Sequence, residues 1–168
     1  YYVAVKLLSN KMRTRKEVIK HLKNRNYDIK TIEEVIKRLY QERYLSDSRY
    51  ITAYINDQLN LTDKGPMKIT RELEALGYRE EVIREQLLKY GDSVWEAKIN
   101  KIIEKKMKLT TNLSASSLRH KIIVHLIDKG HYKDLIMNLI DTYEFKESEK
   151  VLRKEFNKIK SKLEKKYE

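Results

Sequence analysis

The sequence predicts an all-α fold in which tandem three-helix repeats, each resembling a helix-turn-helix unit, stack into an elongated, curved body. Helix breakers are scarce, since the 168 residues include only one proline and four glycines. Apolar residues recur with the spacing of amphipathic helices along most of the chain. Three similar helix ends follow one another at intervals of 51 and 53 residues, which is the pattern of repeated helical units.

The first repeat is expected over residues 1–45. The apolar stripe of its second helix consists of Val18, Ile19 and Leu22. Thr14 is placed to cap the start of this helix. The helix is expected to end at Asn26, because asparagine is the best substitute for glycine in the left-handed conformation that follows many helices. A third helix is expected over 31–42.

The second and third repeats are expected over 46–91 and 92–145. The apolar stripes of their second helices are Ile69, Leu73 and Leu76 in one repeat and Ile122, Ile123 and Leu126 in the other. These helices are expected to end at Gly77 and Gly130, since glycine adopts positive φ freely. Third helices should follow over 80–89 and 133–142.

Helix starts are also marked. The stretch LSDSRYITAYI (45–55) resembles YGDSVWEAKI (90–99), and Asp47 and Asp92 are natural N-caps for the helices that follow. Pro66 is expected in the first turn of a helix, where its missing N–H costs nothing and its fixed φ fits.

The tail over 146–168 has an apolar stripe of its own. The stripe consists of Leu152, Phe156, Ile159 and Leu163, at the spacing i, i+4, i+7, i+11. We expect the first helix of a truncated fourth repeat. The alternative is a terminal helix of the coiled-coil kind. The chain begins with Tyr1 rather than Met, so we expect a fragment of a longer protein.

Charge favours a polyanionic partner. The formal net charge is +12, from 37 Lys and Arg against 25 Asp and Glu, and the excess lies mainly in residues 1–44 and 146–168. The chain has no cysteine, which excludes disulfides and thiolate sites and fits a cytoplasmic protein. The longest apolar run spans only residues 1–5, so no membrane span is expected.

Catalytic and metal-binding motifs are missing from the sequence. No phosphate-binding loop or nucleophile elbow occurs, and the four histidines do not have the spacing of metal ligands. His21 and His125 align with Glu72 in the repeat, which predicts a solvated face at this position. The acidic pairs Glu33-Glu34 and Glu80-Glu81 are expected in the first turns of third helices, where negative charge suits the helix dipole. We therefore expect no enzyme activity, no cofactor and no metal.

Basic residues recur on the first and second helices, and this recurrence predicts a shared surface that faces a partner or DNA. Lys98 and Lys101 belong to the same basic stripe as the third-repeat members of this surface. The predicted surface consists of Arg13, Arg15, Lys16, Lys20, Lys23, Lys64, Lys68, Arg71, Lys105, Lys106 and Lys108. Most tyrosines, including Tyr50, Tyr54 and Tyr78, occupy positions typical of a core.

The runs ERYLSDSRYITAYI and KGPMKITRELEALGY resemble the signature of the RecX family of bacterial recombination regulators. The preceding RTRKEVIKHL is similar to the second helix of the family's first repeat, and the resemblance covers nearly the whole chain. It implies a protein that binds the RecA recombinase filament on single-stranded DNA, lies along its groove and modulates ATP hydrolysis, strand exchange and filament growth. We also expect weak, largely non-specific DNA contact and a monomeric protein.

Two other functions remain open at this point. One is an autonomous nucleic-acid-binding protein of helix-turn-helix type, and the other is a helical-repeat adaptor for a different protein. Acidic residues at the starts of third helices oppose ordinary major-groove reading, because carboxylates there would meet phosphates.

Overall fold

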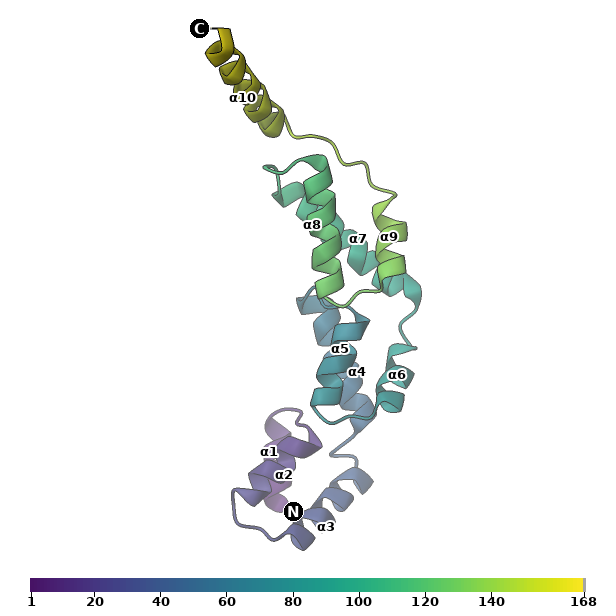
Figure 1. Cartoon of the computed structure of the whole chain (residues 1–168). Coiled ribbons are helices and arrows are strands. Elements are labelled where there is room, and N and C mark those ends of the chain that lie inside the picture. Colours follow the sequence, from purple (N-terminus) through teal and green to yellow (C-terminus); the bar gives the residue numbers. More distant parts are fainter. Residues whose placement is uncertain (168) are drawn as a thin grey trace. The chain divides into compact units, whose positions relative to one another are not determined.

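The computed structural model describes residues 1–167, and the secondary structure within this range is helical (Figure 1). In chain order the helices are α1 (Tyr2–Asn10), α2 (Arg15–Lys23), α3 (Ile29–Gln41), α4 (Asp47–Leu61), α5 (Pro66–Ala75), α6 (Glu80–Leu87), α7 (Asp92–Leu109), α8 (Ala115–Asp128), α9 (Lys133–Ile140) and α10 (Glu149–Tyr167). The all-α class predicted from the sequence is therefore confirmed. None of the described helices combines the length and the apolar character needed to cross a membrane.

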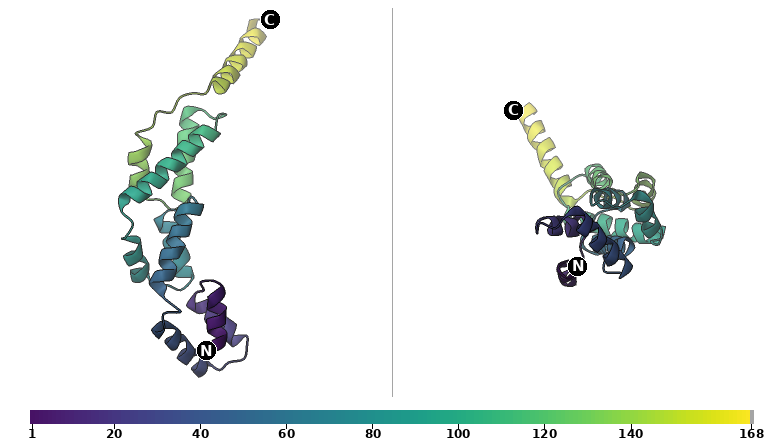
Figure 2. Two further views of the ribbon diagram at one scale, coloured as in Figure 1. Left: turned by 180° about the vertical axis from the view of Figure 1, so that it is seen from behind. Right: turned by 90° about the horizontal axis from the view of Figure 1, so that it is seen from below.

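Neighbouring helices pack in groups that follow the order of the chain. Helix α2 packs against α1 and α3, α4 packs against α6, and α7, α8 and α9 pack against one another. The reverse view in Figure 2 shows α7 alongside α8 and α9. The chain divides into two compact units, which we call unit 1 (residues 1–62 and 69–90) and unit 2 (63–68 and 91–168). The repeat boundaries proposed from the sequence remain a prediction.

Each group buries the apolar stripe of its second helix. In unit 1, Val18 and Leu22 of α2 lie in a cluster with Ile32 and Leu39 of α3. In unit 2, the buried α8 residues Leu118, Ile122 and Leu126 lie in a cluster with residues of α7 and α9. Burying one such side chain stabilises the folded state by about 1.5–3 kcal/mol, so these clusters hold the helices together.

The starts of second helices agree with the sequence, whereas the starts of two first helices do not. Thr14 caps α2, and Pro66 is the first residue of α5. Asp47 and Asp92, in contrast, are the first helical residues of α4 and α7, whose caps are Ser46 and Gly91. At α4 the Ser46 hydroxyl accepts the N–H of Arg49 at 3.3 Å, so Ser46 takes the capping role and Asp47 is free for another bond.

Third helices also differ at their ends. Helix α3 begins at Ile29 because Asp28 caps it, accepting the N–H of Thr31 at 2.9 Å. Glu33 and Glu34 therefore lie in the second turn, and their predicted place in the first turn is wrong. Glu80 and Glu81 do occupy the first turn of α6. The predicted last residues are too late by one to two positions, since α3, α6 and α9 end at Gln41, Leu87 and Ile140.

The three predicted helix stops all adopt the left-handed conformation. The φ values are 63° at Asn26, 97° at Gly77 and 82° at Gly130. Tyr27 N–H donates to Leu22 O, Tyr78 N–H to Leu73 O and His131 N–H to Leu126 O, in the 6→1 pattern of a Schellman cap. The same local device therefore ends all three second helices.

Gly130 meets the start of α5 within unit 2. Gly65 N–H donates to Lys129 O at 2.7 Å, and Met67 N–H donates to Gly130 O at 3.0 Å. A Cβ on Gly65 would lie 2.6 Å from Gly130 O, and a Cβ on Gly130 would lie 2.5 Å from Lys68 N. The two backbones are thus in direct contact. The missing N–H of Pro66 costs no hydrogen bond here, because the N–H of the next residue, Met67, donates to Gly130.

Gly77 meets the start of α2 in a comparable way within unit 1. A Cβ on Gly77 would lie 2.5 Å from Lys16 Cε. The start of one second helix therefore touches the stop of the next second helix both at Gly77 and at Gly130. The difference is that Gly77 faces a flexible side chain, whereas Gly130 faces backbone.

Gly77→Val is expected to lower the free energy of unfolding of unit 1 by about 1–2 kcal/mol, because a β-branched residue must adopt positive φ. Lys16 can swing aside, so little is added by the close contact. Urea unfolding followed by circular dichroism measures the change. A loss above about 4 kcal/mol would contradict this account, because it would mean that Lys16 cannot move.

Helix α10 carries the apolar stripe predicted for the tail. Leu152, Phe156, Ile159 and Leu163 are all at least half exposed. Residues of the corresponding stripe on α7, such as Ile99 and Ile103, are fully buried. The fourth repeat therefore remains a prediction, as does the alternative of a terminal helix of the coiled-coil kind.

Candidate interaction surface

Helix α2 carries most of the predicted basic residues of unit 1. Its start is fixed by a capping box: Glu17 N–H donates to Thr14 Oγ1 at 3.1 Å, and Thr14 N–H donates to Glu17 Oε2 at 2.7 Å. Because Val18 and Leu22 are buried, the opposite face of α2 is exposed. The predicted basic residues on α2, all exposed, are Arg15, Lys16, Lys20 and Lys23.

Two of the predicted cations in unit 1 also make internal contacts. Arg13 Nη1 pairs with Glu17 Oε1 at 3.2 Å. Lys16 Nζ donates to Ala75 O at 3.3 Å, at the last residue of α5, where a cation suits the negative end of the helix dipole. Lys16 therefore ties α2 to α5. Arg71, on the same helix α5, is exposed.

The predicted cations of unit 2 differ in exposure. Lys105 and Lys108 of α7 are exposed, whereas Lys64, Lys68 and Lys106 are partly buried. Lys68 contributes its backbone to the contact with Gly130. The eleven predicted residues are thus divided between the two units, six in unit 1 and five in unit 2. That they form one shared surface remains a proposal.

Lys98 does not belong to an exposed basic stripe. Its side chain is buried on α7, and burial lowers the pKa of its amino group, while the nearby Asp63 carboxylate acts in the opposite direction. Periodicity predicted an exposed stripe through Lys98 and Lys101. That interpretation is wrong at Lys98, which is buried in unit 2 near Asp63 of the loop before α5.

Asp63 joins this loop to α8. His125 Nε2 lies 3.0 Å from Asp63 Oδ2, and His131 Nε2 donates to Asp63 O at 2.8 Å. Burial raises the pKa of Asp63, but the bond with His125 and the charges of Lys105 and Lys106 outweigh it, so the net pKa is lowered. Asp63 is therefore charged at neutral pH and holds α8 to the loop.

The predicted solvated face at His125 and Glu72 is wrong. His125 is partly buried against Asp63, and Glu72 Oε2 accepts the hydroxyl of Tyr54 at 2.6 Å. The repeat alignment correctly placed the two residues at one position. The position accepts a polar side chain because each has a polar partner, not because it faces water.

His131 makes the stability of unit 2 dependent on pH. Burial lowers its pKa from the usual 6.5, so the folded state binds fewer protons here than the unfolded state below about pH 6.5. Stability from this group is complete above that pH and is lost as the pH falls through the lowered value. We expect the free energy of unfolding to drop as the pH is lowered from 7 to 5.

Trp95, the single tryptophan of the chain, is buried in unit 2, so its fluorescence during urea unfolding measures this drop. His131→Gln should flatten the pH dependence, because glutamine does not titrate. His120→Gln, at an exposed position, is the matched control and should leave the slope as in the unaltered chain. An unchanged slope in His131→Gln would contradict the assignment.

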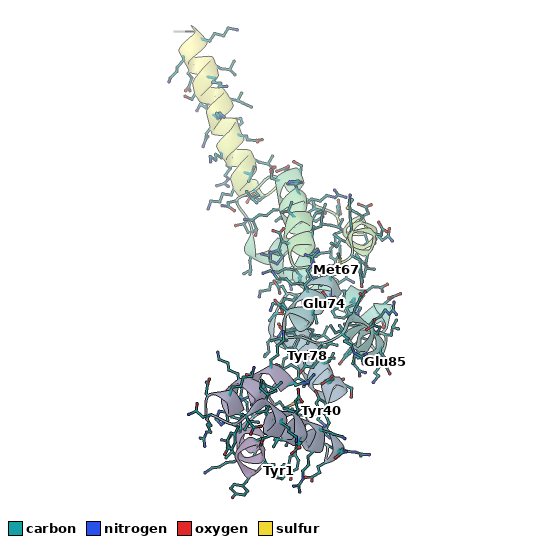
Figure 3. All side chains as sticks on the ribbon, turned by 60° about the horizontal axis from the view of Figure 1, so that its bottom comes forward. Tyr1, Tyr40, Met67, Glu74, Tyr78 and Glu85 are labelled. Carbon is teal, nitrogen blue, oxygen red and sulfur yellow. The ribbon has the colours of Figure 1, made fainter. Side chains whose placement is uncertain are left out.

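Tyrosine side chains link α3, α4 and α5 through ring stacking and hydrogen bonds inside unit 1. The Tyr50 ring stacks on Tyr78 with centroids 5.3 Å apart, and Tyr40 Oη donates to Asp47 Oδ1 at 2.6 Å. Burial raises the pKa of Tyr40, Tyr54 and Tyr78, and the carboxylates that accept from Tyr40 and Tyr54 raise it further. Figure 3 labels Tyr40 and Tyr78 among the side chains of this unit. Tyr50, Tyr54 and Tyr78, for which core positions were predicted, are partly buried between helices and are not fully buried core residues.

Sequence reasoning missed two arginines, one directly after α3 and one in the first turn of α4. Arg43 has φ of 62° directly after α3, and both Arg43 and Arg49 line pockets in unit 1. The repeat alignment gave no signal for them, because the smaller pocket is completed by α1 and the connection that follows it, and the larger pocket by residues of α3 and α6. Within the described residues, no group of His, Asp or Glu side chains is arranged to hold a metal ion.

Comparison with known proteins agrees with this helical architecture. The family profile described as "RecX, first three-helix domain" matches residues 1–39. A curated relative from Geobacillus thermodenitrificans named regulatory protein RecX is 32% identical over 136 residues, which cover 81% of this chain and 51% of the relative. Another of the same name from Streptococcus agalactiae serotype III is 31% identical and aligns with 96% of this chain and 63% of its own length. The chain belongs to the RecX family.

A solved RecX structure agrees in fold. The crystal structure of RecX from Lactobacillus salivarius superposes with a TM-score of 0.78 at 29% identity, over 84% of this chain and 92% of that chain. The chain spans between 51% and 63% of the length of the two curated RecX relatives. Similarity to RecX thus extends well beyond the first three helices.

Proposed function

We propose that this RecX chain is a cytoplasmic regulator of the RecA recombinase. It binds the filament on single-stranded DNA along the filament groove and inhibits ATP hydrolysis, strand exchange and filament growth. Membership of the RecX family carries the proposal, because the curated relatives bear the name regulatory protein. The chain acts through binding and without chemistry of its own.

Repetition and charge support a partner that is itself periodic. The left-handed stop and its contact with a preceding second helix occur at Gly77 and again at Gly130. Successive repeats therefore present similar faces, and several weak contacts on one chain add through effective concentration. Exposed cations such as Lys20 and Lys23 suit an acidic protein surface or DNA phosphates.

Titration of a RecA filament with this chain tests the proposal directly. We expect ATP hydrolysis on single-stranded DNA to fall at ratios at or below one chain per recombinase protomer. Strand exchange and filament lifetime provide two further readouts. If all three stay unchanged with the cognate recombinase, the proposal fails. The recombinase without DNA, given the same amounts of chain, supplies the background rate.

Acidic residues at the starts of two third helices argue against a helix-turn-helix that reads duplex DNA. Glu80 and Glu81 stand in the first turn of α6, and Asp134 stands in the first turn of α9. Carboxylates at these positions would approach DNA phosphates if the helix entered a groove. Sequence-specific binding to duplex DNA in the absence of recombinase would favour this alternative over the proposed function.

A further inference from the structure

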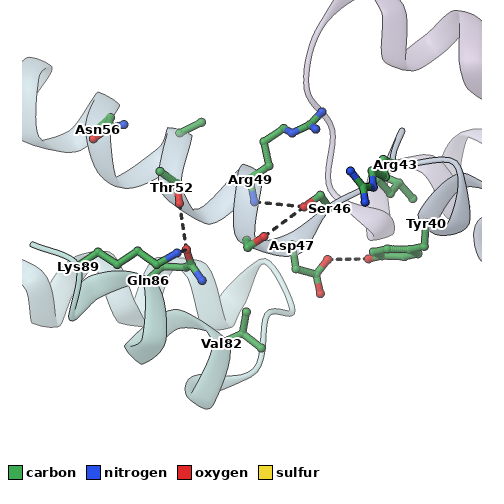
Figure 4. A pocket seen from close by; sticks show the side chains of 13 residues that line it. Tyr40, Arg43, Ser46, Asp47, Arg49, Thr52, Asn56, Val82, Gln86 and Lys89 are labelled. Atoms are coloured by element: carbon green, nitrogen blue, oxygen red, sulfur yellow. Dashed lines mark hydrogen bonds between the residues drawn. The ribbon is translucent and has the colours of Figure 1, made fainter.

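A small pocket in unit 1 brings three arginines together. It has a volume of about 200 Å³ and is lined by Arg13, Arg43 and Arg49, with Ser9 and Ser46 beside them. The arginines come from three parts of the chain: the connection between α1 and α2, the end of α3 and the first turn of α4. A larger pocket of about 870 Å³, drawn in Figure 4, shares Arg43 and Arg49. In this view the Arg49 side chain extends away from Gln86 and Lys89.

The positive charge in this pocket is largely uncompensated. Within the described residues, Arg43 and Arg49 form no ion pair, and Arg13 is shared only with Glu17 at 3.2 Å. The Nε of Arg13 is buried and has no hydrogen-bond partner in this part of the chain. The nearby Asp47 carboxylate is already bonded to Tyr40 at 2.6 Å. Guanidinium groups placed in this way favour an anion with several acceptor oxygens.

Arg43 occupies a backbone position that favours glycine. Its φ of 62° lies in the left-handed region, directly after the last turn of α3. Tyr44 N–H donates to Leu39 O at 2.9 Å, which is the 6→1 bond of a Schellman cap. Arg43 is therefore the C′ residue of α3. An arginine there carries backbone strain that glycine would avoid, and an observed strain of this kind points to a use for the side chain.

The start of α4 adds to the same pocket. Helix α4 has 15 residues, and its cap Ser46 lines the pocket together with Arg49 of the first turn. The positive end of the helix dipole therefore lies beside the three arginines. Tyr44, which is 49% exposed, lines the same pocket and offers a ring face next to it.

We propose that this pocket binds a backbone phosphate of a single-stranded nucleic acid, with the neighbouring base stacked on Tyr44. The pocket is large enough for a single phosphate group, and the arginines and the α4 dipole suit its charge. The exposed tyrosine favours nucleic acid over an acidic protein segment, because a base stacks on an aromatic ring whatever its identity. The choice of nucleic acid rests on the proposed function, whereas the anion site rests on the pocket alone.

Binding to a short oligothymidylate, measured by fluorescence anisotropy without recombinase, tests the proposal. We expect Arg43→Gly and Arg49→Gln each to weaken binding about 3- to 10-fold at low salt. Each should also reduce the slope of log affinity against log salt by about 0.7. Arg43→Gly should meanwhile keep or raise the thermal midpoint, because it removes the strain at the left-handed position. If Arg43 had only a structural role, Arg43→Gly would leave binding unchanged and lower the thermal midpoint.

Arg25→Gln is the matched control, since it removes one exposed positive charge of unit 1 that does not line the pocket. The inference is overturned if Arg25→Gln weakens binding as much as the pocket variants, or if the unaltered chain does not bind oligothymidylate. It is also overturned if the pocket variants weaken binding of polyglutamate and leave oligothymidylate unaffected, because the site then takes carboxylates. Pocket-dependent oligothymidylate binding supports it even if the RecA titration fails.

Discussion

Gly130→Ala is expected to destabilise unit 2 by about 3 kcal/mol. The φ of 82° at Gly130 costs an L-residue about 1–2 kcal/mol. The added Cβ would in addition lie 2.5 Å from Lys68 N and 2.7 Å from Lys68 Cβ. Helix α5 is held at this point by the bond from Met67 N–H to Gly130 O at 3.0 Å, so relief requires backbone movement and adds about 1–3 kcal/mol.

Urea unfolding followed by Trp95 fluorescence measures this loss, because Trp95 lies in unit 2. Gly91→Ala is the matched control in the same unit. A Cβ at Gly91 would meet only Ser93 Oγ, at 3.8 Å, and Gly91 has an ordinary φ of −67°. We expect Gly91→Ala to change the free energy of unfolding by about 1 kcal/mol or less. Equal losses in the two variants would show that the contact between α5 and the Gly130 turn is not tight.

The helix stops show what local sequence can predict. Asn26, Gly77 and Gly130 were identified as left-handed residues because that conformation depends mainly on the residue itself. Why two of the stops are glycine could not be read from the sequence. A Cβ at Gly77 or Gly130 would lie 2.5 Å from an atom of Lys16 or Lys68, whereas Asn26 carries its Cβ at an exposed position. A Cβ is therefore tolerated at Asn26 for a reason that lies in tertiary packing.

The errors at Lys98 and His125 have one physical origin. Periodicity identifies the face of a helix that packs within its own three-helix group, and it identified Ile122 and Leu126 correctly. It says nothing about a second face that a connecting loop covers. Asp63 comes from such a loop and is 62 residues from His125 in sequence. Contacts of this kind make Lys98 and His125 structural rather than solvated residues.

The candidate surface is affected by the same limitation. Lys16 was selected for its exposure on α2, and its amino group also bonds Ala75 O at 3.3 Å. Arg43 was not selected, because nothing in its local sequence indicates that it meets Arg13 and Arg49 at one pocket. Charge pattern can therefore nominate a helix face, but the partners that a cation already has decide whether it is available to a ligand.

Neutralising the α2 face is expected to weaken binding to the RecA filament about 3- to 150-fold at low salt. The variant Arg15→Gln/Lys20→Gln/Lys23→Gln removes three exposed cations and retains Arg13 and Lys16, which make internal contacts. Each exposed ion pair contributes about 0.2–1 kcal/mol, so three contribute about 0.6–3 kcal/mol. If the three cations contact single-stranded DNA, the slope of log affinity against log salt should also fall by about 2.

Sedimentation with filaments over a range of salt measures both effects. The triple variant Arg25→Gln/Lys30→Gln/Lys37→Gln is the matched control. It removes the same charge from exposed positions of unit 1 outside the predicted surface. A specific α2 contact predicts that the control keeps nearly all of the affinity, because long-range attraction alone is screened beyond about 10 Å at 0.1 M salt. Equal losses in the two variants would instead mean that total charge, and not the α2 face, determines binding.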